Sequence, residues 1–213
     1  MNAKDLIGKL HWLGHDSFRL DGPPVIYFDP WKLRRRPPVA DLVLVSHEHS
    51  DHCSPNDVKK VCGPDTVVVA NAGAAAKLRG AQVIRPGDRL NVAGVEVEAV
   101  RAYNVNKFRS AGVPFHPREA EHVGYIVTVD GVRVYFAGDT DHIPEMADIA
   151  CDVAFLPVSG TYVMTAEEAA EAARTLKPQI VVPMHYGSGI GTADDGRQFA
   201  ELYGGQVALL KAE

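Results

Sequence analysis

The stretch LVLVSHEHSDHCSP, residues 42–55, decides the fold, because it joins a wholly apolar run to a cluster of titratable side chains. His47, His49 and His52 follow the apolar run closely, and Asp51 lies among them. In an extended segment, residues two apart project to the same side, so His47 and His49 can share one ion. Asp51 and His52 are adjacent and point differently, which suits a second ion. Imidazoles and carboxylates are ordinary zinc ligands, so the stretch predicts a metal site at the end of a buried strand.

Size and composition fit an ordinary globular protein of 213 residues, with 46% hydrophobic and 23% charged residues. The net charge of -5 argues against nucleic-acid binding, which normally uses a basic face. Three cysteines, Cys53, Cys62 and Cys151, follow no paired spacing, which favours reduced thiols. We find neither a signal-peptide pattern nor an apolar run that could span a bilayer, so we expect a soluble, cytoplasmic protein with a small-molecule substrate and no membrane partner.

Short runs rich in β-branched residues predict most of the secondary structure. The predicted strands are residues 25–29, 41–46, 66–70, 95–100, 124–129, 132–138, 152–158 and 179–184. Asp130-Gly131 between two of them predicts a tight hairpin. Capping signals predict helices in residues 54–62, 165–178 and 193–205.

The two halves of the chain contain pairs of weakly similar segments. VIYFDP and VRVYFAGD each deliver an aspartate, Asp29 or Asp139, at the end of an apolar run. LVLVSH and IVVPMH each deliver a histidine, His47 or His185. Polar residues at buried strand ends face the rim where sites are built. We therefore expect one domain, residues 1–213, made of two pseudo-symmetric halves (about 10–90 and 92–210) whose strand ends converge.

These residues together resemble the metallo-β-lactamase superfamily, in particular its short UlaG-like branch of metal-dependent hydrolases. The motifs that carry the resemblance are HEHSDH, GDTDHIPEM and MHYG, with WLGHDSF, FDPW, AYN and VGYIVTVDG. The likeness extends from about Leu10 to Leu210. It implies an α/β fold, a four-layer αββα sandwich of two mixed β-sheets flanked by helices, with metals at one edge.

The resemblance also implies two sets of metal ligands. The first ion would be bound by His47, His49 and a third histidine, the second by Asp51, His52 and His185, and Asp139 would bridge them. This chain departs from the pattern, because Tyr103 or Asn104 stands where many members carry the third histidine.

Two histidines downstream are candidates for the missing ligand. His116 lies within the stretch 104–121 and His122 directly follows it. The glycine, prolines and mixed charges of this stretch predict a flexible loop that could fold over the site. His116 would then be the third ligand or a substrate contact, with a solvent-exposed role as the alternative. If neither histidine binds, the first ion would be weakly held and one metal would remain.

Several other residues have two interpretations each. Asp29 matches a family aspartate that holds the histidine loop through hydrogen bonds, and His15 either lines the pocket or is an ordinary hairpin histidine. His142 belongs to the rim or the plain surface. The cationic side chains in the stretch 104–121 either steer an anionic substrate or are simply solvated: Lys107, Arg109 and Arg118.

The predicted function is hydrolysis of an ester, lactone, amide or phosphodiester bond in a small molecule, anionic in one version, by a metal-activated hydroxide. Asp51 and Asp139 are the candidate catalytic residues, with Asp139 orienting the nucleophile. Two Zn²⁺ ions are our default, with Mn²⁺ or Fe as alternatives. Competing functions are a phosphodiesterase or nuclease and a non-catalytic metal sensor with an incomplete first site. A di-iron oxidoreductase is disfavoured, because His49 occupies the position of its glutamate.

Overall fold

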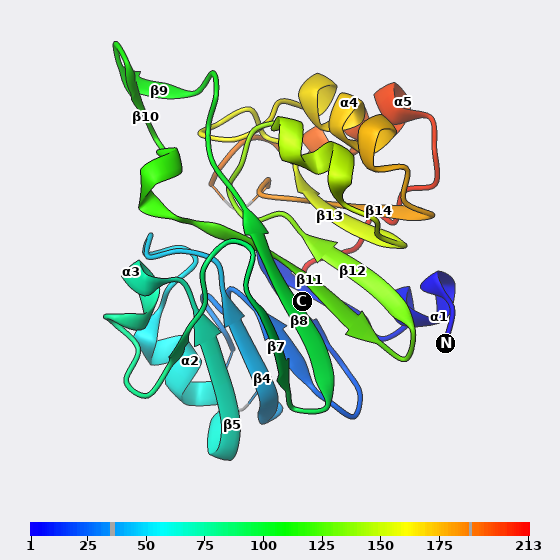
Figure 1. Cartoon of the computed structure of the whole chain (residues 1–213). Coiled ribbons are helices and arrows are strands. Elements are labelled where there is room, and N and C mark those ends of the chain that lie inside the picture. The colour runs from blue at the N-terminus through cyan, green and yellow to red at the C-terminus, as the bar shows by residue number, and fades with distance from the viewer. Residues whose placement is uncertain (35–36, 188) are drawn as a thin grey trace.

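Two six-stranded mixed sheets face each other in the computed structural model, which describes residues 1–34, 37–187 and 189–213 (Figure 1). The first sheet has strands in sequence order: β1 (Leu10–Gly14), β2 (Ser17–Leu20), β3 (Ile26–Phe28), β4 (Ala40–Val45), β5 (Cys62–Ala70) and β6 (Gln82–Val83). The second has the order β14 (Ile180–Met184), β13 (Val153–Pro157), β12 (Val132–Phe136), β11 (Val123–Val129), β8 (Val95–Arg101) and β7 (Arg89–Val92). All eight predicted strands are present.

Helices cover the outer faces of both sheets. Beside the first sheet lie α2 (Pro55–Val61) and α3 (Ala72–Ala75), and beside the second lie α4 (Ala166–Leu176) and α5 (Asp195–Tyr203) (Figure 1). The described residues also form the short helix α1 (Ala3–Ile7) and the 3-10 turns Arg118–Ala120 and Pro144–Asp148. The predicted four-layer αββα sandwich is confirmed.

Local sequence signals explain where α2 and α4 begin and where α5 ends. The Ser54 side chain accepts a hydrogen bond from the backbone N–H of Asp57, and Pro55 is the first residue of α2. Thr165 and Glu168 form a reciprocal capping box at the start of α4. Helix α5 ends at Gly204, which takes the left-handed conformation. The three predicted helices are therefore confirmed together with their caps.

Strand β4 shows why the central strands are apolar throughout. Leu42 and Leu44 point into the core between the two sheets, whereas Val43 and Val45 pack against α2 and α3. All four side chains are buried, because alternate residues of a strand face opposite sides and both sides are covered.

Aromatic residues join the two sheets. The ring centroids of Phe28 and Phe136 lie 5.1 Å apart, and those of Phe18 and Phe155 lie 4.8 Å apart. Each buried ring of this kind stabilises the fold by roughly 1.5–3 kcal/mol relative to an exposed one. This packing fixes the distance between the sheets and hence between the two halves of the site.

Residues 10–83 build the first sheet and residues 89–184 build the second. The pseudo-symmetry of the halves stays a prediction. The Asp130-Gly131 hairpin is confirmed, with φ of 47° and 80° at the two turn positions. Among the described residues, no helix combines the length and the apolar character needed to cross a bilayer.

The stretch 104–121 differs from the flexible loop that we predicted. It contains a two-stranded hairpin, β9 (Phe108–Ser110) with β10 (Val113–Pro114), followed by the turn Arg118–Ala120. The hairpin projects from the sandwich at the upper left of Figure 1. Backbone pairing around the positive-φ Gly112 gives this arm a regular structure that periodicity in so short a segment does not reveal.

Candidate metal centre

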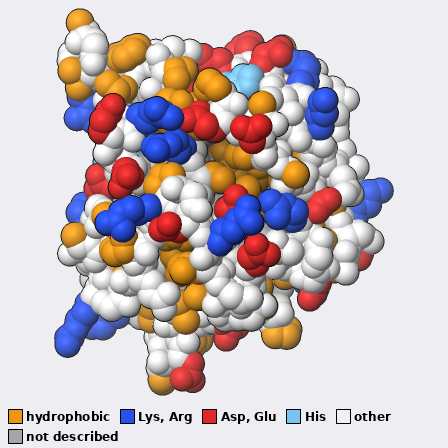
Figure 2. Space-filling model, in the orientation of Figure 1, with side chains coloured by type: hydrophobic (Ala, Val, Ile, Leu, Met, Phe, Trp, Pro, Cys, Tyr) orange, Lys and Arg blue, Asp and Glu red, His pale blue; other side chains and the backbone are white. Residues whose placement is uncertain are grey.

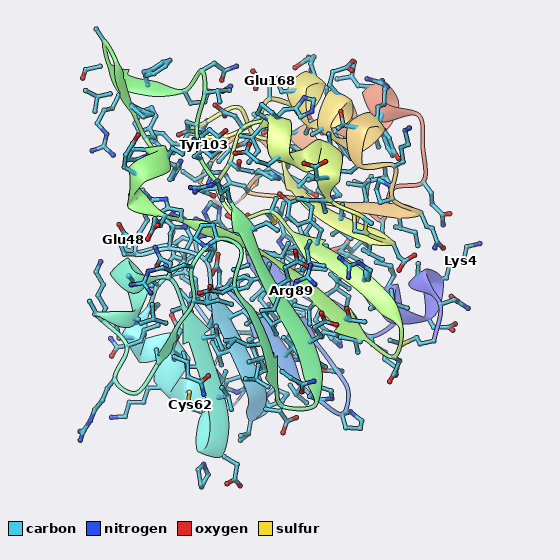
Figure 3. The ribbon with its side chains drawn as sticks, in the orientation of Figure 1. Lys4, Glu48, Cys62, Arg89, Tyr103 and Glu168 are labelled. Atoms are coloured by element: carbon cyan, nitrogen blue, oxygen red, sulfur yellow. The ribbon has the colours of Figure 1, made fainter. Side chains whose placement is uncertain are left out.

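The site lies where parallel strands of both sheets end at one edge of the sandwich. Strands β3, β4 and β5 run parallel in the first sheet, as do β12, β13 and β14 in the second. His47 follows β4, Asp139 follows β12 and His185 follows β14 directly. Figure 3 shows the labelled Glu48, after β4, and Tyr103, after β8, at this same edge.

The backbone at these strand ends is bent into conformations that L-residues rarely adopt. His15, Asp29 and His185 have φ of 55°, 40° and 59°. Each such residue costs on the order of 1–3 kcal/mol, and such strain clusters at functional sites. Gly138 also has positive φ, and a Cβ there would lie 3.1 Å from the Val123 carbonyl oxygen. These strained turns direct the polar side chains at the strand ends towards the interior of the site.

The first cluster unites His47, His49, His116 and Asp139. His49 Nδ1 lies 3.0 Å from His47 Nε2 and 3.2 Å from His116 Nε2. Asp139 Oδ2 lies 3.1 Å from His116 Nε2 and 3.9 Å from His47 Nε2. Ligand atoms around a tetrahedral zinc ion, with bonds of about 2.0–2.1 Å, would be about 3.3–3.4 Å apart. The spacing therefore fits four ligands of one ion.

Asn104 holds His116 in this cluster. Its Oδ1 accepts hydrogen bonds from the His116 backbone N–H at 2.8 Å and from Nδ1 at 2.9 Å. Its Nδ2 donates to Asp141 Oδ1 and to the Tyr162 carbonyl oxygen. With a proton on Nδ1, the His116 ring presents the lone pair of Nε2 to the cluster. His116, twelve residues after Asn104, thus lies in the cluster in place of the histidine that the family pattern has at position 104.

The second cluster lies on the other side of Asp139. Asp139 Oδ1 is 3.4 Å from both His52 Nε2 and His185 Nε2, so each oxygen of this carboxylate faces a different cluster. His15 and Asp16 complete the group of buried side chains. Asp51 is more peripheral, because its Oδ2 lies 4.0 Å from His52 Nε2 and 3.1 Å from His15 Nε2.

In three of the histidines, the ring nitrogen that faces away from the clusters has a fixed hydrogen-bond partner. Asp29 Oδ2 accepts from His52 Nδ1 at 2.7 Å and from the Ser46 hydroxyl at 2.5 Å. Ser46 Oγ then accepts from His47 Nδ1, and Ser159 Oγ lies 3.0 Å from His185 Nδ1. Such partners fix the ring orientation and leave Nε2 free for a metal. Asp29 therefore lies where the sequence predicted it, behind the histidine loop.

The pKa shifts of the histidines differ between the two clusters. Burial and the neighbouring His116 lower the pKa of His49 to about 4, so its ring is neutral at neutral pH, as a ligand must be. Burial opposes protonation of His185, but the carboxylates of Asp139 and Asp16 raise its pKa to about 9. A proton on that ring occupies the position that a cation would take.

The donor atoms themselves test whether cations fit. Within the described residues, several deeply buried atoms of the second cluster have no hydrogen-bond partner: both oxygens of Asp16, Oδ1 of Asp139, and Nε2 of His52 and of His185. Buried polar groups are normally satisfied, and leaving one unpaired costs about 1–3 kcal/mol. One cation among them would satisfy these atoms, and the ligand spacing of the first cluster fits another, so the residues present fit a two-metal centre.

The structure thus brings together ligand candidates from both halves of the sequence, with Asp51 at the edge: His47, His49, His52, His116, Asp139 and His185. His142 lies apart, with its Nε2 3.1 Å from Thr175 Oγ1. His122 is buried beside His47, with ring centroids 4.7 Å apart, and its Nε2 lies 3.4 Å from Glu48 Oε1. The roles of these residues toward a metal stay predictions.

Sequence reasoning missed Asp16 and Asp141. Asp141 Oδ2 accepts from the backbone N–H groups of Val105 and Asn106, which fixes the start of the arm that carries His116. The second aspartate of GDTD was a usable signal, because acids commonly anchor loops through backbone N–H groups. Asp16 had the weaker signal of an acid next to His15 at a hairpin turn.

A pocket of about 370 Å³ opens onto the clusters. It is lined by His49, Asp51, Arg109, Phe115, His116, Asp139 and Tyr162. Other cavities lie elsewhere on the surface, and a larger one beside the Asp130 hairpin holds none of the metal-binding candidates. We take the pocket at the clusters as the candidate active site, because it is lined by His49, His116 and Asp139, and Oδ1 of Asp139 is one of the unpaired buried atoms of the described residues.

The fold and the site together define a metal-dependent hydrolase of the metallo-β-lactamase type. Residues 9–185 match the model of the beta-lactamase superfamily domain, and the chain belongs to this family.

Named relatives cover almost the whole chain. The UPF0173 metal-dependent hydrolase of Thermococcus kodakarensis is 32% identical over 215 residues, which span 95% of each protein. That of Thermoplasma acidophilum is 31% identical, over 92% of this chain and 91% of the relative. A solved structure assigned as a metal-dependent hydrolase of Parabacteroides distasonis is 37% identical with a TM-score of 0.82, covering 96% of this chain and 93% of that one.

Proposed function

We propose that this protein hydrolyses an ester, lactone, amide or phosphodiester bond of a small molecule at a centre of two divalent cations, with zinc as the default metal. A cation bound there would lower the pKa of a water molecule to about 7 and would polarise the scissile carbonyl or phosphoryl group. The observation that supports the proposal is the pair of buried histidine–aspartate clusters on either side of Asp139, a residue that also lines the pocket.

The chain's own carboxylates have separate tasks in this proposal. Asp139 offers one oxygen to each cluster and so holds the two cation positions together. The Asp51 side chain is 31% exposed and lines the pocket, where it can accept a proton from the attacking water. His15 Nε2 lies near two carboxylates, so it must donate, and its hydrogen bond keeps Asp51 oriented.

The pocket lining supports a small substrate with an apolar part and an anionic part. Phe115 and Tyr162 pack edge to face, with centroids 4.6 Å apart, and form an apolar wall. Arg109 lies over the Phe115 ring and donates to its carbonyl oxygen, so its guanidinium carries a charge beside the pocket. Lys107, by contrast, is paired with Glu168 at 2.6 Å. Arg109 is therefore our candidate for recognising an anionic group.

A nuclease is less well supported than a small-molecule hydrolase. The pocket volume is near the lower end of the roughly 300–1,000 Å³ typical of small-molecule sites. Figure 2 shows basic side chains interleaved with acidic ones on the face in view, and the net charge is -5. The sensor alternative was based on a missing first-site ligand, and the position of His116, with its Nε2 3.2 Å from His49 Nδ1, supports the hydrolase instead.

Turnover of a panel of esters, lactones, amides and phosphodiesters by metal-replete protein tests the proposal. Asp139→Ala and His49→Ala should each abolish hydrolysis while the circular dichroism spectrum is preserved. His142→Ala is the matched control, since His142 is near Asp139 in sequence and outside the clusters. Retained turnover in either cluster variant would place the chemistry elsewhere, and tightly bound metal without any turnover would favour the sensor.

A further inference from the structure

We propose that Glu48 and His122 are positioning residues for the first cation. They form a hydrogen-bonded pair that lies against the first cluster without belonging to its four ligand candidates, and they hold the imidazoles of that cluster in place. The inference deepens the proposed function and rests on it in one respect, namely that the first cluster binds a cation.

The side chain of Glu48 is held against the start of α3. Its Oε2 accepts a hydrogen bond at 3.4 Å from Nδ2 of Asn71, the residue that caps this helix. Gly73 leaves room for the carboxylate, because a Cβ at that position would lie 2.3 Å from Glu48 Oε2. Figure 3 shows Glu48 at the side of the molecule where Figure 1 places α3. The carboxylate therefore lies in a socket that a larger residue at position 73 would close.

His122 connects this carboxylate to the first cluster. Its Nε2 lies 3.4 Å from Glu48 Oε1 and donates to it, since a carboxylate can only accept. The His122 side chain is buried. Its ring centroid lies 4.7 Å from that of His47, 5.8 Å from that of His49 and 5.6 Å from that of His116. His122 thus packs against every imidazole of the first cluster, while Glu48 fixes its own orientation.

His49 is the ligand candidate that depends most on this pair. Ser46 holds the His47 ring and Asn104 holds the His116 ring through hydrogen bonds. Within the described residues, the hydrogen bonds of the His49 ring run only to other members of the cluster. Its position therefore depends on its backbone and on packing against neighbouring rings.

Glu48 restrains that backbone directly. It lies between His47 and His49 in the chain, so a contact that fixes Glu48 restrains both neighbours. Lys77 Nζ adds a second restraint from the same side, because it donates to the Glu48 carbonyl oxygen at 2.7 Å. Partners that orient metal ligands are typically worth 10–100-fold in metal affinity. Since Glu48 and His122 act through packing and backbone, we expect an effect at the lower end of this range.

Affinity for Zn²⁺ measures the inference without reference to turnover. We would strip the full-length protein with a chelator and titrate it with Zn²⁺ against a competing chelator, with His49→Ala identifying the binding step of the first cluster. Wild type should bind two ions. Glu48→Ala and His122→Leu should each bind the first ion about tenfold more weakly. Glu48→Gln should stay within about threefold of wild type, because it keeps an acceptor oxygen for His122.

Gly73→Ala displaces the Glu48 carboxylate without altering either member of the pair. The added methyl group meets the far end of a flexible side chain, which can move at little cost, and alanine is a better helix former than glycine. Metal-free Gly73→Ala should therefore unfold in urea at or above the wild-type midpoint and still bind the first ion about tenfold more weakly. Ala72→Ser, an exposed change in the same helix, is the matched control and should keep wild-type affinity.

The variants distinguish positioning from other roles. Wild-type affinity for the first ion in Glu48→Ala or in Gly73→Ala would overturn the proposal, because the pair would then serve the fold alone. An equal loss in Glu48→Gln and Glu48→Ala would also overturn it, since charge and not the hydrogen bond would then matter. Loss of the first ion in His122→Leu to the extent seen in His49→Ala would make His122 a ligand. Wild type that binds no Zn²⁺ would refute the proposed function itself and this inference with it.

Discussion

Replacing Asn104 by alanine tests how the first cluster is assembled. The Asn104 amide makes four hydrogen bonds, two to His116, one to Asp141 and one to the Tyr162 carbonyl oxygen. A buried hydrogen bond is worth about 1 ± 0.5 kcal/mol, so we expect the free energy of unfolding of the metal-free protein to fall by about 3–5 kcal/mol. Because His116 loses the acceptor that fixes its ring, the first ion should bind about 10–100-fold more weakly.

Two further variants separate orientation of His116 from general stability. Asn104→Asp keeps the acceptor for His116 but loses both donors and places a carboxylate beside Asp141, so it should destabilise the fold with a smaller loss of ion affinity. Asn106→Ala, in the same segment, removes an exposed amide that contacts Glu168 and should leave the first ion unaffected.

Urea unfolding of the metal-free proteins and chelator competition with Zn²⁺ provide the two measurements. The reasoning is wrong if Asn104→Ala binds the first ion within about threefold of wild type, or if Asn106→Ala weakens it equally. In the first case His116 would be positioned by the arm itself, and in the second the effect would be one of loop stability.

Two more predictions concern the pocket and the fold. Arg109→Ala should lower kcat/KM about tenfold for an anionic substrate and leave a neutral analogue with the same scissile bond unaffected, which steady-state kinetics can check; an equal loss for both would exclude anion recognition. Asp57 accepts from the backbone N–H groups of Lys32 and Leu33, and although burial opposes its charge, hydrogen bonds from Lys60 and Ser54 hold its pKa below the ordinary 3.8. A carboxyl group whose pKa is lower in the folded than in the unfolded protein stabilises the fold above its unfolded pKa, and this stabilisation is lost as the pH falls through its folded pKa. Asp57→Asn should therefore lower the free energy of unfolding by about 1–3 kcal/mol at pH 7 and by progressively less towards pH 3, as measured by urea unfolding. A difference between wild type and variant that does not change with pH would contradict this role of Asp57.

Much of the fold could be predicted from local patterns. The eight apolar runs became strands because their side chains cannot remain in water, and the caps at Ser54 and Thr165 act within one turn of helix. The short strands β1 and β2 were not among the predicted runs, because LHWLG and SFRL contain no Val, Ile or Thr, although His15 between them had the alternative role of a hairpin histidine. Their burial comes from covering elements, including the chain's end, where Trp12 pairs with Ala212.

In the candidate site, too, only the residues whose placement depends on local sequence could be predicted. His47 and His49 share a side because their spacing is local, and Asp139 and His185 were found because each follows an apolar strand. His116 could only be named as one of two candidates, because its approach to His49 depends on the β9–β10 arm and on Asn104. No local pattern encodes that contact.

The sequence by itself determined which segments are buried strands, where the helices begin, and that imidazoles and carboxylates gather at strand ends. Those properties depend on neighbours a few residues apart. Only the tertiary structure decided that Asp16 lies inside the second cluster and Asp51 at its edge, because both are acids beside a histidine and their burial depends on how the two sheets pack. Distances between groups far apart in sequence are set by the sheets' packing and by strained turns, which one-dimensional spacing does not contain.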